Sequence, residues 1–140
     1  MVIADTGFWL ALANRKDLHY ATAKLRLSQL KEGLVTTWPV MTETCHLLLH
    51  RLGGDAQRRF VRSYSLGAFE VFDLESGHAR RIEAYMRKYA DLPMDLADAS
   101  LVILAEHLGH GRILSTDERD FRTYRFKSRR PFENLFFSDD

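Results

Sequence analysis

Five carboxylates stand at the edges of the most apolar segments of this sequence. Asp5 ends the apolar run VIAD, and Asp117 directly follows the run RILST. Asp95 and Asp98 open the apolar segment MDLADASLVILAEHLG, and their spacing places both on one side of a helix start. Glu43 lies early in PVMTETCHLLLHRLGG, beside the apolar stripe that this segment would present as a helix. These five acids are candidates for one shared site.

Carboxylates that crowd into one hollow repel one another, and without a cation they take up protons or destabilise the fold. An all-oxygen set of donors is hard and favours Mg²⁺ or Mn²⁺. The sequence has one cysteine, no HExxH motif and no D-x-D-x-D-G run, so it indicates neither a zinc site nor an EF-hand. A carboxylate cage around one or two such ions can activate water and neutralise charge on a phosphate, which is the chemistry of phosphoryl transfer.

Each acid also has a simpler structural interpretation. Asp95 or Asp98 could cap a helix and complement its dipole, and Asp5 could be an N-cap or turn residue. Glu43 could be a solvated glutamate, and Asp117 could belong to a solvated turn. The prediction of a shared site therefore depends on the joint placement of all five acids.

Short apolar runs alternate with helical patterns along the chain. Strands are predicted at residues 1–5, 34–37, 68–74 and 112–116, with a possible further short strand at 122–126. Helices are predicted at residues 6–14, 17–33, 39–54, 55–67, 76–91 and 94–109, the second of them closed by Gly33. Apolar strands without alternation, separated by helices, indicate a parallel sheet covered on both faces. Ligands bind beyond the carboxyl ends of such strands, where Asp5 and Asp117 would meet if their strands are neighbours.

Length and charge limit the classes of protein to consider. The 140 residues suit one domain over 1–140, with no linker or repeat. The formal net charge of +1 means that any binding of nucleic acid must come from a local basic patch. The single cysteine, Cys45, excludes an internal disulfide, and with no signal-peptide pattern this favours a reducing cytosol. No apolar run approaches the roughly 20 residues that a membrane span needs.

The densest basic run comes just after Asp117. Its members are Arg119, Arg122, Arg125, Lys127, Arg129 and Arg130. Tyr124, Phe126 and Phe132 are interleaved with them. Arginine binds phosphate through a fork of donors, and aromatic rings can stack on unpaired bases, so the run is a candidate RNA-binding surface. The simpler interpretation is a solvated surface above aromatic core residues.

Four segments together resemble the PIN-domain ribonucleases, and within them the VapC-type toxins of toxin–antitoxin pairs. The matching segments are IADTGFWLAL, TTWPVMTETCHLL, LPMDLADASLVILAEHLG and ILSTDERDF, which occur in the family's order and span nearly the whole chain. The resemblance implies a three-layer α/β/α PIN-like fold with a four- or five-stranded parallel sheet. It also implies a cytoplasmic endoribonuclease that depends on Mg²⁺ or Mn²⁺ and leaves 5′-phosphate and 3′-hydroxyl ends.

The resemblance assigns roles residue by residue. The family's catalytic acids, which also ligate the metal, fall on Asp5, Glu43, Asp98 and Asp117. Asp95 lies where relatives often carry a further aspartate and is expected to assist as a metal ligand. Ser115 stands where threonine is more usual and keeps the hydroxyl, and Thr6 or its backbone is expected to orient Asp5. RNA would lie on Arg119, Arg122, Arg125 and Lys127.

Two partners are implied by the same resemblance. A small VapB-like antitoxin would cover the acidic pocket or the groove beside it, and the apolar residues at 8–13 and 21–30 are a possible docking surface. A second copy of the chain would form a homodimer.

Two other functions remain open at this point. A non-toxin PIN relative could process RNA, or bind it without cutting, although retention of all four family acids opposes a non-catalytic role. A receiver-like signalling domain would also have an acidic Mg²⁺ pocket. The acids here are spread over four segments, and no lysine lies suitably at a late strand end, which opposes that alternative.

Overall fold

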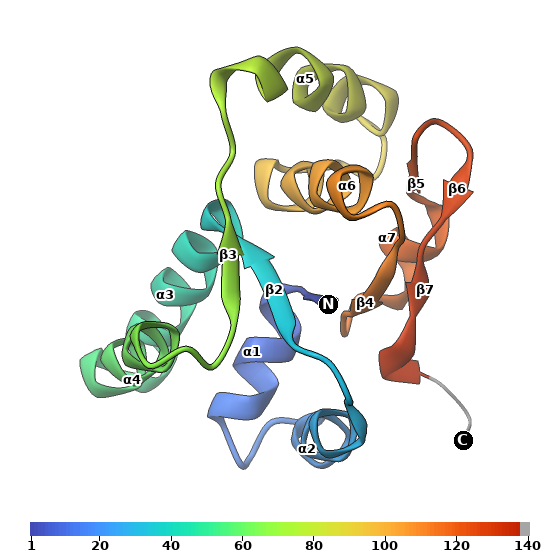
Figure 1. Cartoon of the computed structure of the whole chain (residues 1–140). Helices are drawn as coiled ribbons and strands as arrows, with labels where there is room; N and C mark the ends of the chain where they lie inside the picture. Colours follow the sequence, from blue (N-terminus) through green and yellow to red (C-terminus); the bar gives the residue numbers. More distant parts are fainter. Residues whose placement is uncertain (138–140) are drawn as a thin grey trace.

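The computed structural model of the protein describes residues 1–137 and contains a parallel sheet with the strand order β3-β2-β1-β4-β7 (Figure 1). The five strands are β1 (Val2–Ala4), β2 (Leu34–Thr37), β3 (Glu70–Phe72), β4 (Arg112–Leu114) and β7 (Glu133–Asn134). Each neighbouring pair is parallel, as predicted. The predicted domain over 1–140 includes residues 138–140, which lie outside the described part of the chain.

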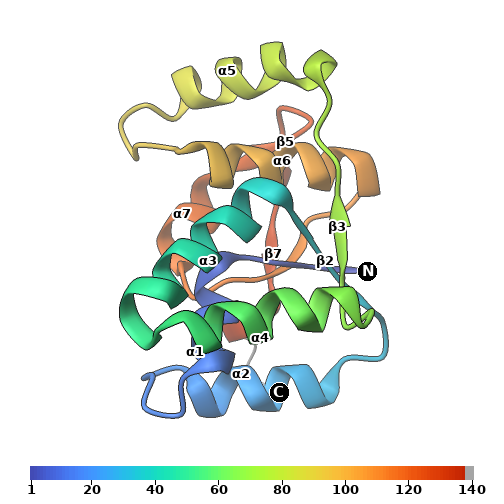
Figure 2. The same ribbon diagram turned by 90° about the vertical axis from the view of Figure 1, so that its left-hand side faces the viewer.

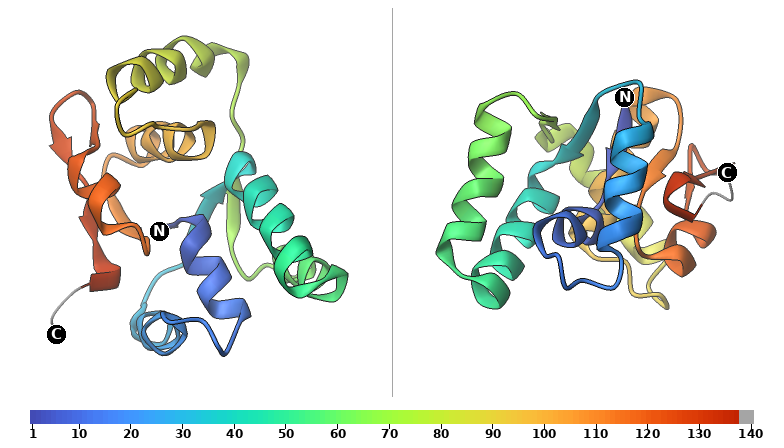
Figure 3. Two further views of the ribbon diagram at one scale, coloured as in Figure 1. Left: turned by 180° about the vertical axis from the view of Figure 1, so that it is seen from behind. Right: turned by 90° about the horizontal axis from the view of Figure 1, so that it is seen from below.

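Helices cover both faces of this sheet. They are α1 (Thr6–Ala13), α2 (Tyr20–Gln29), α3 (Trp38–Leu52), α4 (Gly54–Ser65), α5 (Ala79–Lys88), α6 (Leu96–Leu108) and α7 (Glu118–Thr123), with 3₁₀ turns η1 (Ser76–His78) and η2 (Leu135–Phe137). Helices α5 and α6 lie on one side, and α1 and α2 on the other, with α3 and α4 beside them (Figures 1 and 2). The views from behind and from below agree with this layering (Figure 3), and the three-layer α/β/α fold is confirmed.

Burial explains why the central elements are so apolar. All three residues of β1 are at most 1% exposed, and Ile113 and Leu114 of β4 are fully buried. Helix α6 lies between the sheet and α5, so it is buried from Leu101 to Ala105 on every side. Helix α5 is the outer helix of this face and has no fully buried residue. A helix that is apolar all round is the expected sequence of an inner layer.

At the level of elements, one prediction was wrong, one was correct in part, and one strand was not predicted. Helix α2 ends at Gln29, with Leu30 as its C-cap, so Gly33 does not close it. Residues 122–126 contain the end of α7 and β5 (Arg125–Phe126), which pairs antiparallel with β6 (Arg130–Pro131) outside the main sheet. The fifth strand of the sheet is instead β7, whose two residues carry no apolar pattern.

The order of the strands creates a crevice between β1 and β4. The chain runs outward from β1 to β2 and β3, and then returns to place β4 on the other side of β1. This reversal is a topological switch point, where the connections that leave two neighbouring strands diverge. The order also differs from the 2-1-3-4-5 order of flavodoxin-like receivers, which opposes a receiver-like domain. No helix within residues 1–137 is long and apolar enough to cross a membrane.

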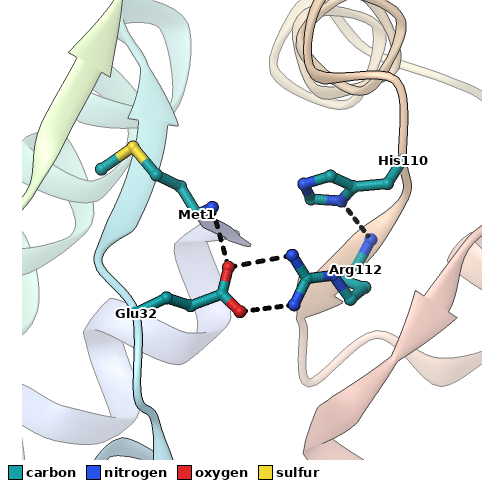
Figure 4. A network of polar contacts seen from close by, with 4 residues as sticks. All are labelled: Met1, Glu32, His110 and Arg112. Carbon is teal, nitrogen blue, oxygen red and sulfur yellow. Dashed lines mark hydrogen bonds and ion pairs between the residues drawn. The ribbon is translucent and has the colours of Figure 1, made fainter.

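A charged network joins the amino-terminal ends of the central strands, at the other end of the sheet from the predicted acids (Figure 4). Glu32, just before β2, accepts hydrogen bonds from both terminal nitrogens of Arg112 on β4, and its Oε1 lies 2.7 Å from the Met1 nitrogen. The Arg112 guanidinium and then the Met1 amino group hold the pKa of Glu32 at about 2. The backbone N–H of Arg112 donates to Nδ1 of His110. These contacts link the amino-terminal ends of the three central strands, so their carboxyl ends are held in register.

Candidate active site

Three of the five predicted acids are N-caps. Oδ1 of Asp5 accepts a hydrogen bond of 2.7 Å from the first N–H of α1, and Asp95 accepts one of 2.9 Å from the Asp98 N–H in α6. Asp117 accepts one of 3.0 Å from the third N–H of α7. The structural interpretation of Asp5 and Asp95 as caps is therefore correct, whereas Asp117 caps a helix instead of lying in a solvated turn; capping does not exclude the chemical interpretation. Each cap engages one oxygen and places a negative charge at the favourable end of a helix dipole.

Ser115 joins two of these acids at the switch point. Its hydroxyl donates to Oδ2 of Asp5 at 2.9 Å and accepts the Asp117 N–H at 3.0 Å. The Asp5 N–H also donates to the carbonyl of Leu114, so the ends of β1 and β4 are directly connected. Asp5 and Asp117 thus lie on either side of Ser115, which fixes their relative position.

Ser115 is itself held by a residue that the sequence did not indicate. Asn134 on β7 accepts the Ser115 N–H at 3.2 Å and donates from Nδ2 to the Ser115 carbonyl at 2.9 Å. An asparagine side chain that pairs with both backbone groups of one residue acts like an extra segment of strand. Asn134 lies outside all the motifs that pointed to the site, and its role depends on contacts with residues 19 positions away in the sequence.

The environment of Asp5 disfavours its charge. Burial raises the pKa of Asp5 to about 6, against the lowering effect of the hydrogen bonds from Thr6 and Ser115. The negative charges of Glu43 and Asp117 raise this pKa further. Glu43 is half-buried on α3, so it contributes to the same electrostatic site as the two strand-end acids.

Asp98 is perturbed more strongly. Its pKa is raised to about 8 by burial first, and then by the charges of Asp5 and Asp95, with a smaller contribution from Asp117. The hydroxyl of Tyr124 donates to Oδ2 of Asp98 at 2.9 Å and opposes this rise.

Glu43 and Asp95 line a pocket of about 640 Å³ where α3 and α6 begin. The other lining residues include Trp38, Pro39, Thr42, His46 and Leu96. Two buried hydroxyls hold these helix starts together, because Oγ of Ser100 on α6 lies 2.6 Å from Oγ1 of Thr37, the N-cap of α3. The pocket therefore opens beside the acids and has a mainly apolar wall.

All five acids take part in one set of charge interactions, because each of them either raises the pKa of another member or has its own pKa raised by one. Their donor chemistry suits a hard divalent cation. Within residues 1–137, however, no three side chains of histidine, cysteine, aspartate or glutamate lie close enough together to form a ready chelating cluster. The arrangement supplies charge and oxygen donors for a cation without a closed cage.

Thr6 acts on Asp5 through its backbone. The Thr6 N–H is the donor that caps α1, while its buried Oγ1 has no hydrogen-bond partner among residues 1–137. The next residue, Gly7, lies so close to Thr116 that an added Cβ would come within 1.9 Å of the threonine Oγ1. Glycine is therefore required where α1 passes the loop that carries the last acid, a constraint that the local sequence did not reveal.

The predicted basic residues differ in how free they are. Arg119, Arg122 and Lys127 are exposed, and Arg122 forms an ion pair with Glu118 one turn away. Arg125 is half-buried, and its Nη1 donates to three successive backbone carbonyls at residues 122–124.

The aromatic residues of the same segment belong mainly to the core. Tyr124 and Phe126 are at most 1% exposed, and Phe132 is half-buried against Phe121 and Phe126. Stacking of RNA bases on Tyr124 or Phe126 is therefore wrong, and the simpler interpretation of these rings as core residues is correct.

The raised pKa values predict how the metal-free protein responds to pH. Between its ordinary value of 3.8 and about 8, Asp98 holds its proton more tightly in the folded than in the unfolded state. This contribution to stability is full below the unfolded pKa and is lost as pH rises through the folded pKa. With chelator present, we expect Asp98→Asn to unfold at higher urea concentration than the parent, by a margin that grows from about pH 4 to about pH 8.

At about 1.4 kcal/mol per pKa unit, the margin at the upper end is of the order of a few kcal/mol. Urea titrations of both proteins across this range measure it. Asp55→Asn, at an exposed position on α4, serves as the control and should follow the parent. Equal stability of Asp98→Asn and the parent at every pH would show that the pKa of Asp98 is not raised in the folded protein.

Comparisons with known proteins agree with this geometry. The PIN domain family model matches residues 2–127. The chain is similar to Ribonuclease VapC26 of Mycobacterium tuberculosis, with 27% identity over 124 residues that cover 89% of this chain and 92% of that protein. The crystal structure of Mycobacterium tuberculosis VapC20, a sarcin-ricin loop cleaving toxin, has a similar fold, with a TM-score of 0.81, 23% identity and coverage of 94% of this chain and 100% of that one. The chain belongs to the PIN domain family.

Proposed function

We propose that this protein is an endoribonuclease of the VapC type, the toxin of a toxin–antitoxin pair, and that it hydrolyses RNA with the help of Mg²⁺ or Mn²⁺. The observation that carries the proposal is the convergence of Asp5, Glu43, Asp98 and Asp117 at the switch point of a PIN-fold sheet. The similarity of this chain to Ribonuclease VapC26 supports the choice of RNA as substrate.

The acids have distinct parts in this proposal. Asp5, Asp98 and Asp117 are the principal ligands, and Glu43 and Asp95 assist from the adjoining pocket. When bound, the cation activates water and neutralises charge on the phosphate. Mg²⁺ retains several water ligands, so carboxylates set wider than a closed cage can still serve it.

The chain's own groups prepare the site. Ser115 and the helix N-termini hold the oxygens of Asp5 and Asp117 in place before any ligand arrives. Burial first, and then neighbouring negative charges, raise the pKa of Asp98 to about 8, so a cation held by this carboxylate would compete with a proton for it. Activity is therefore expected to increase with pH as proton and cation compete less.

Removal of one acid tests the proposal. We expect Asp5→Asn, Glu43→Gln, Asp98→Asn and Asp117→Asn each to lower cleavage of labelled RNA by more than about 100-fold, beyond the cost of losing a supporting partner. Chelator should abolish cleavage by the parent, and Mn²⁺ should restore it.

Asp55→Asn is again the matched control, because Asp55 is an aspartate at a helix start, away from the five acids. Circular dichroism checks that each variant is folded. Parent-level cleavage by the Asp5 or the Asp98 variant would refute the assignment of the site.

An exposed basic edge beside the site supports RNA binding. Arg119, Arg122 and Lys127 follow Asp117 closely in the chain and point their charges to solvent, while Arg125 stiffens the backbone between them. A protein of net charge +1 has a weak summed field, so this local edge would supply the contacts to phosphate.

Arg122→Ser tests this edge against Arg58→Ser. Both arginines are exposed and pair with an acid on their own helix, but Arg58 lies on α4, on the opposite side of Figure 1 from α7. We expect Arg122→Ser to raise KM for RNA and to reduce the slope of log affinity against log salt by about 0.7, the value for one contact to a single strand. An unchanged slope, or an equal loss in Arg58→Ser, would exclude Arg122 from the RNA surface.

A cavity of about 440 Å³ between α1, α2 and α4 supports docking of the antitoxin. Its apolar lining includes Trp9, Leu12, Leu27, Leu34, Phe60 and Phe69. The indole N–H of Trp9 is buried and has no hydrogen-bond partner among residues 1–137. An apolar peptide segment would fill the cavity and could offer this donor a carbonyl. The cavity includes residues of both segments, 8–13 and 21–30, that the sequence indicated as a docking surface.

Leu27→Glu would place a charge in this cavity, whereas Leu18→Glu would change a leucine that is 90% exposed outside it. We expect Leu27→Glu to weaken inhibition of RNA cleavage by the cognate VapB-type antitoxin, with basal cleavage unchanged. Leu18→Glu should be inhibited like the parent. Equal inhibition of both variants would exclude the cavity as the docking site.

We also propose that residues 1–140 form a single domain and that the protein is a homodimer in the cytoplasm. Apolar residues left exposed on α3 and α4 support pairing, namely Leu49, Leu52 and Val61, each 42–44% exposed. Light scattering of the purified protein decides the oligomeric state, and a monomer at micromolar concentration would refute the dimer.

A further inference from the structure

Tyr124 is a fully buried residue that reaches one of the candidate ligands. It is 0% exposed, and its hydroxyl donates to Oδ2 of Asp98 at 2.9 Å. The two residues are 26 positions apart in the sequence, and the helix that precedes Tyr124 begins at another acid, Asp117. Because the ring is buried, it cannot stack on a base, and its hydroxyl cannot reach a partner molecule.

The ring has little freedom to turn. Tyr89 and Phe121 contact it edge to face, with centroids 5.0 Å and 5.2 Å away. The Tyr124 N–H donates to the carbonyl of Asp120 and closes α7. The direction of the hydroxyl is therefore fixed by packing and by backbone together.

The segment that follows is fastened to the same layer of helices. The Arg125 N–H donates to the Tyr89 hydroxyl at 3.0 Å, and the Lys127 N–H donates to Oε2 of Glu106 on α6 at 2.9 Å. Glu106 Oε2 also accepts the Tyr85 hydroxyl at 2.6 Å. The bonds from Arg125 and Lys127 keep the Tyr124 hydroxyl at a constant position relative to α6, which carries Asp98.

The consequence for Asp98 is geometric. The terminal torsion of an aspartate is broad, so a carboxylate without partners samples many orientations. The Oδ2 atom of Asp98 accepts the Tyr124 hydroxyl, which limits rotation of the carboxylate and leaves Oδ1 for a ligand. Partners behind a ligand that fix its orientation commonly matter for metal affinity.

We propose that Tyr124 is a positioning residue that orients Asp98 for the divalent cation. This rests on the proposed function, since it names a residue that acts through one of the ligands of that site. Helix α7 then has two tasks, because its first end bears Asp117 and its last end bears the group that orients Asp98. One short helix sets the positions of two acids that belong to different segments.

Tyr124→Phe removes the hydroxyl and keeps the buried ring. We expect the dissociation constant for Mn²⁺, followed by the paramagnetic resonance of free Mn²⁺, to rise about tenfold, in the range found for partners behind metal ligands. We expect kcat for labelled RNA to fall by a similar factor at limiting Mn²⁺, with KM for RNA unchanged. A second test adds Tyr124→Phe to Asp98→Asn, where it should not weaken Mn²⁺ binding further.

Tyr85→Phe is the matched control, because it removes the hydroxyl of a half-buried tyrosine that likewise donates to a carboxylate, that of Glu106, away from the five acids. It should change the melting temperature at most and leave Mn²⁺ affinity at the parent value. An equal loss of Mn²⁺ affinity in Tyr85→Phe, or parent affinity in Tyr124→Phe, would overturn the proposal, as would a parent protein that does not bind Mn²⁺. If the parent binds Mn²⁺ but does not cut RNA, the proposed function fails while the comparison of Mn²⁺ affinities still decides the role of Tyr124.

Discussion

Repulsion between carboxylates is the constraint on which the rest of this structure depends. The sheet brings Asp5 and Asp117 together at one crevice, and α3 and α6 add three more acids nearby. The fold offsets part of this repulsion with three helix N-termini and two hydroxyls, those of Ser115 and Tyr124. Burial first, and then the neighbouring negative charges, keep the pKa values of Asp5 and Asp98 raised, so the offset is incomplete. A divalent cation is the natural complement to the charge that remains.

The rest of the fold holds these acids in place despite their mutual repulsion. The opposite edge of the sheet is closed by the pairing of Glu32 with Arg112, where opposite charges attract and the pKa of the acid is lowered. The amino-terminal ends of the central strands therefore carry paired opposite charges, whereas their carboxyl ends carry acids that repel one another. Between them, β1 and the apolar residues of β4 are buried, and the two short strands are directly paired, which limits how far the crowded acids can move apart.

The sequence predicted those features that arise from local pattern. Alternating apolar runs and helices indicated a parallel sheet, and the structure has one. Acids at the ends of such runs indicated a shared site, and the structure links two of them, Asp5 and Asp117, through Ser115. The features that were missed depend on contacts between distant residues. Strand β7 has two residues and no apolar pattern, so nothing local distinguishes it from a loop. The contact of Gly7 with Thr116 and the bond from Tyr124 to Asp98 likewise exist only once the chain has folded.

Strand β7 also bears on where the working unit of this protein ends. The family match stops at residue 127, while the asparagine that holds both backbone groups of Ser115 is residue 134. A boundary drawn from family likeness would discard the edge strand that steadies the serine between two acids. The part of the chain that positions the acids thus extends past the matched segment and includes β7.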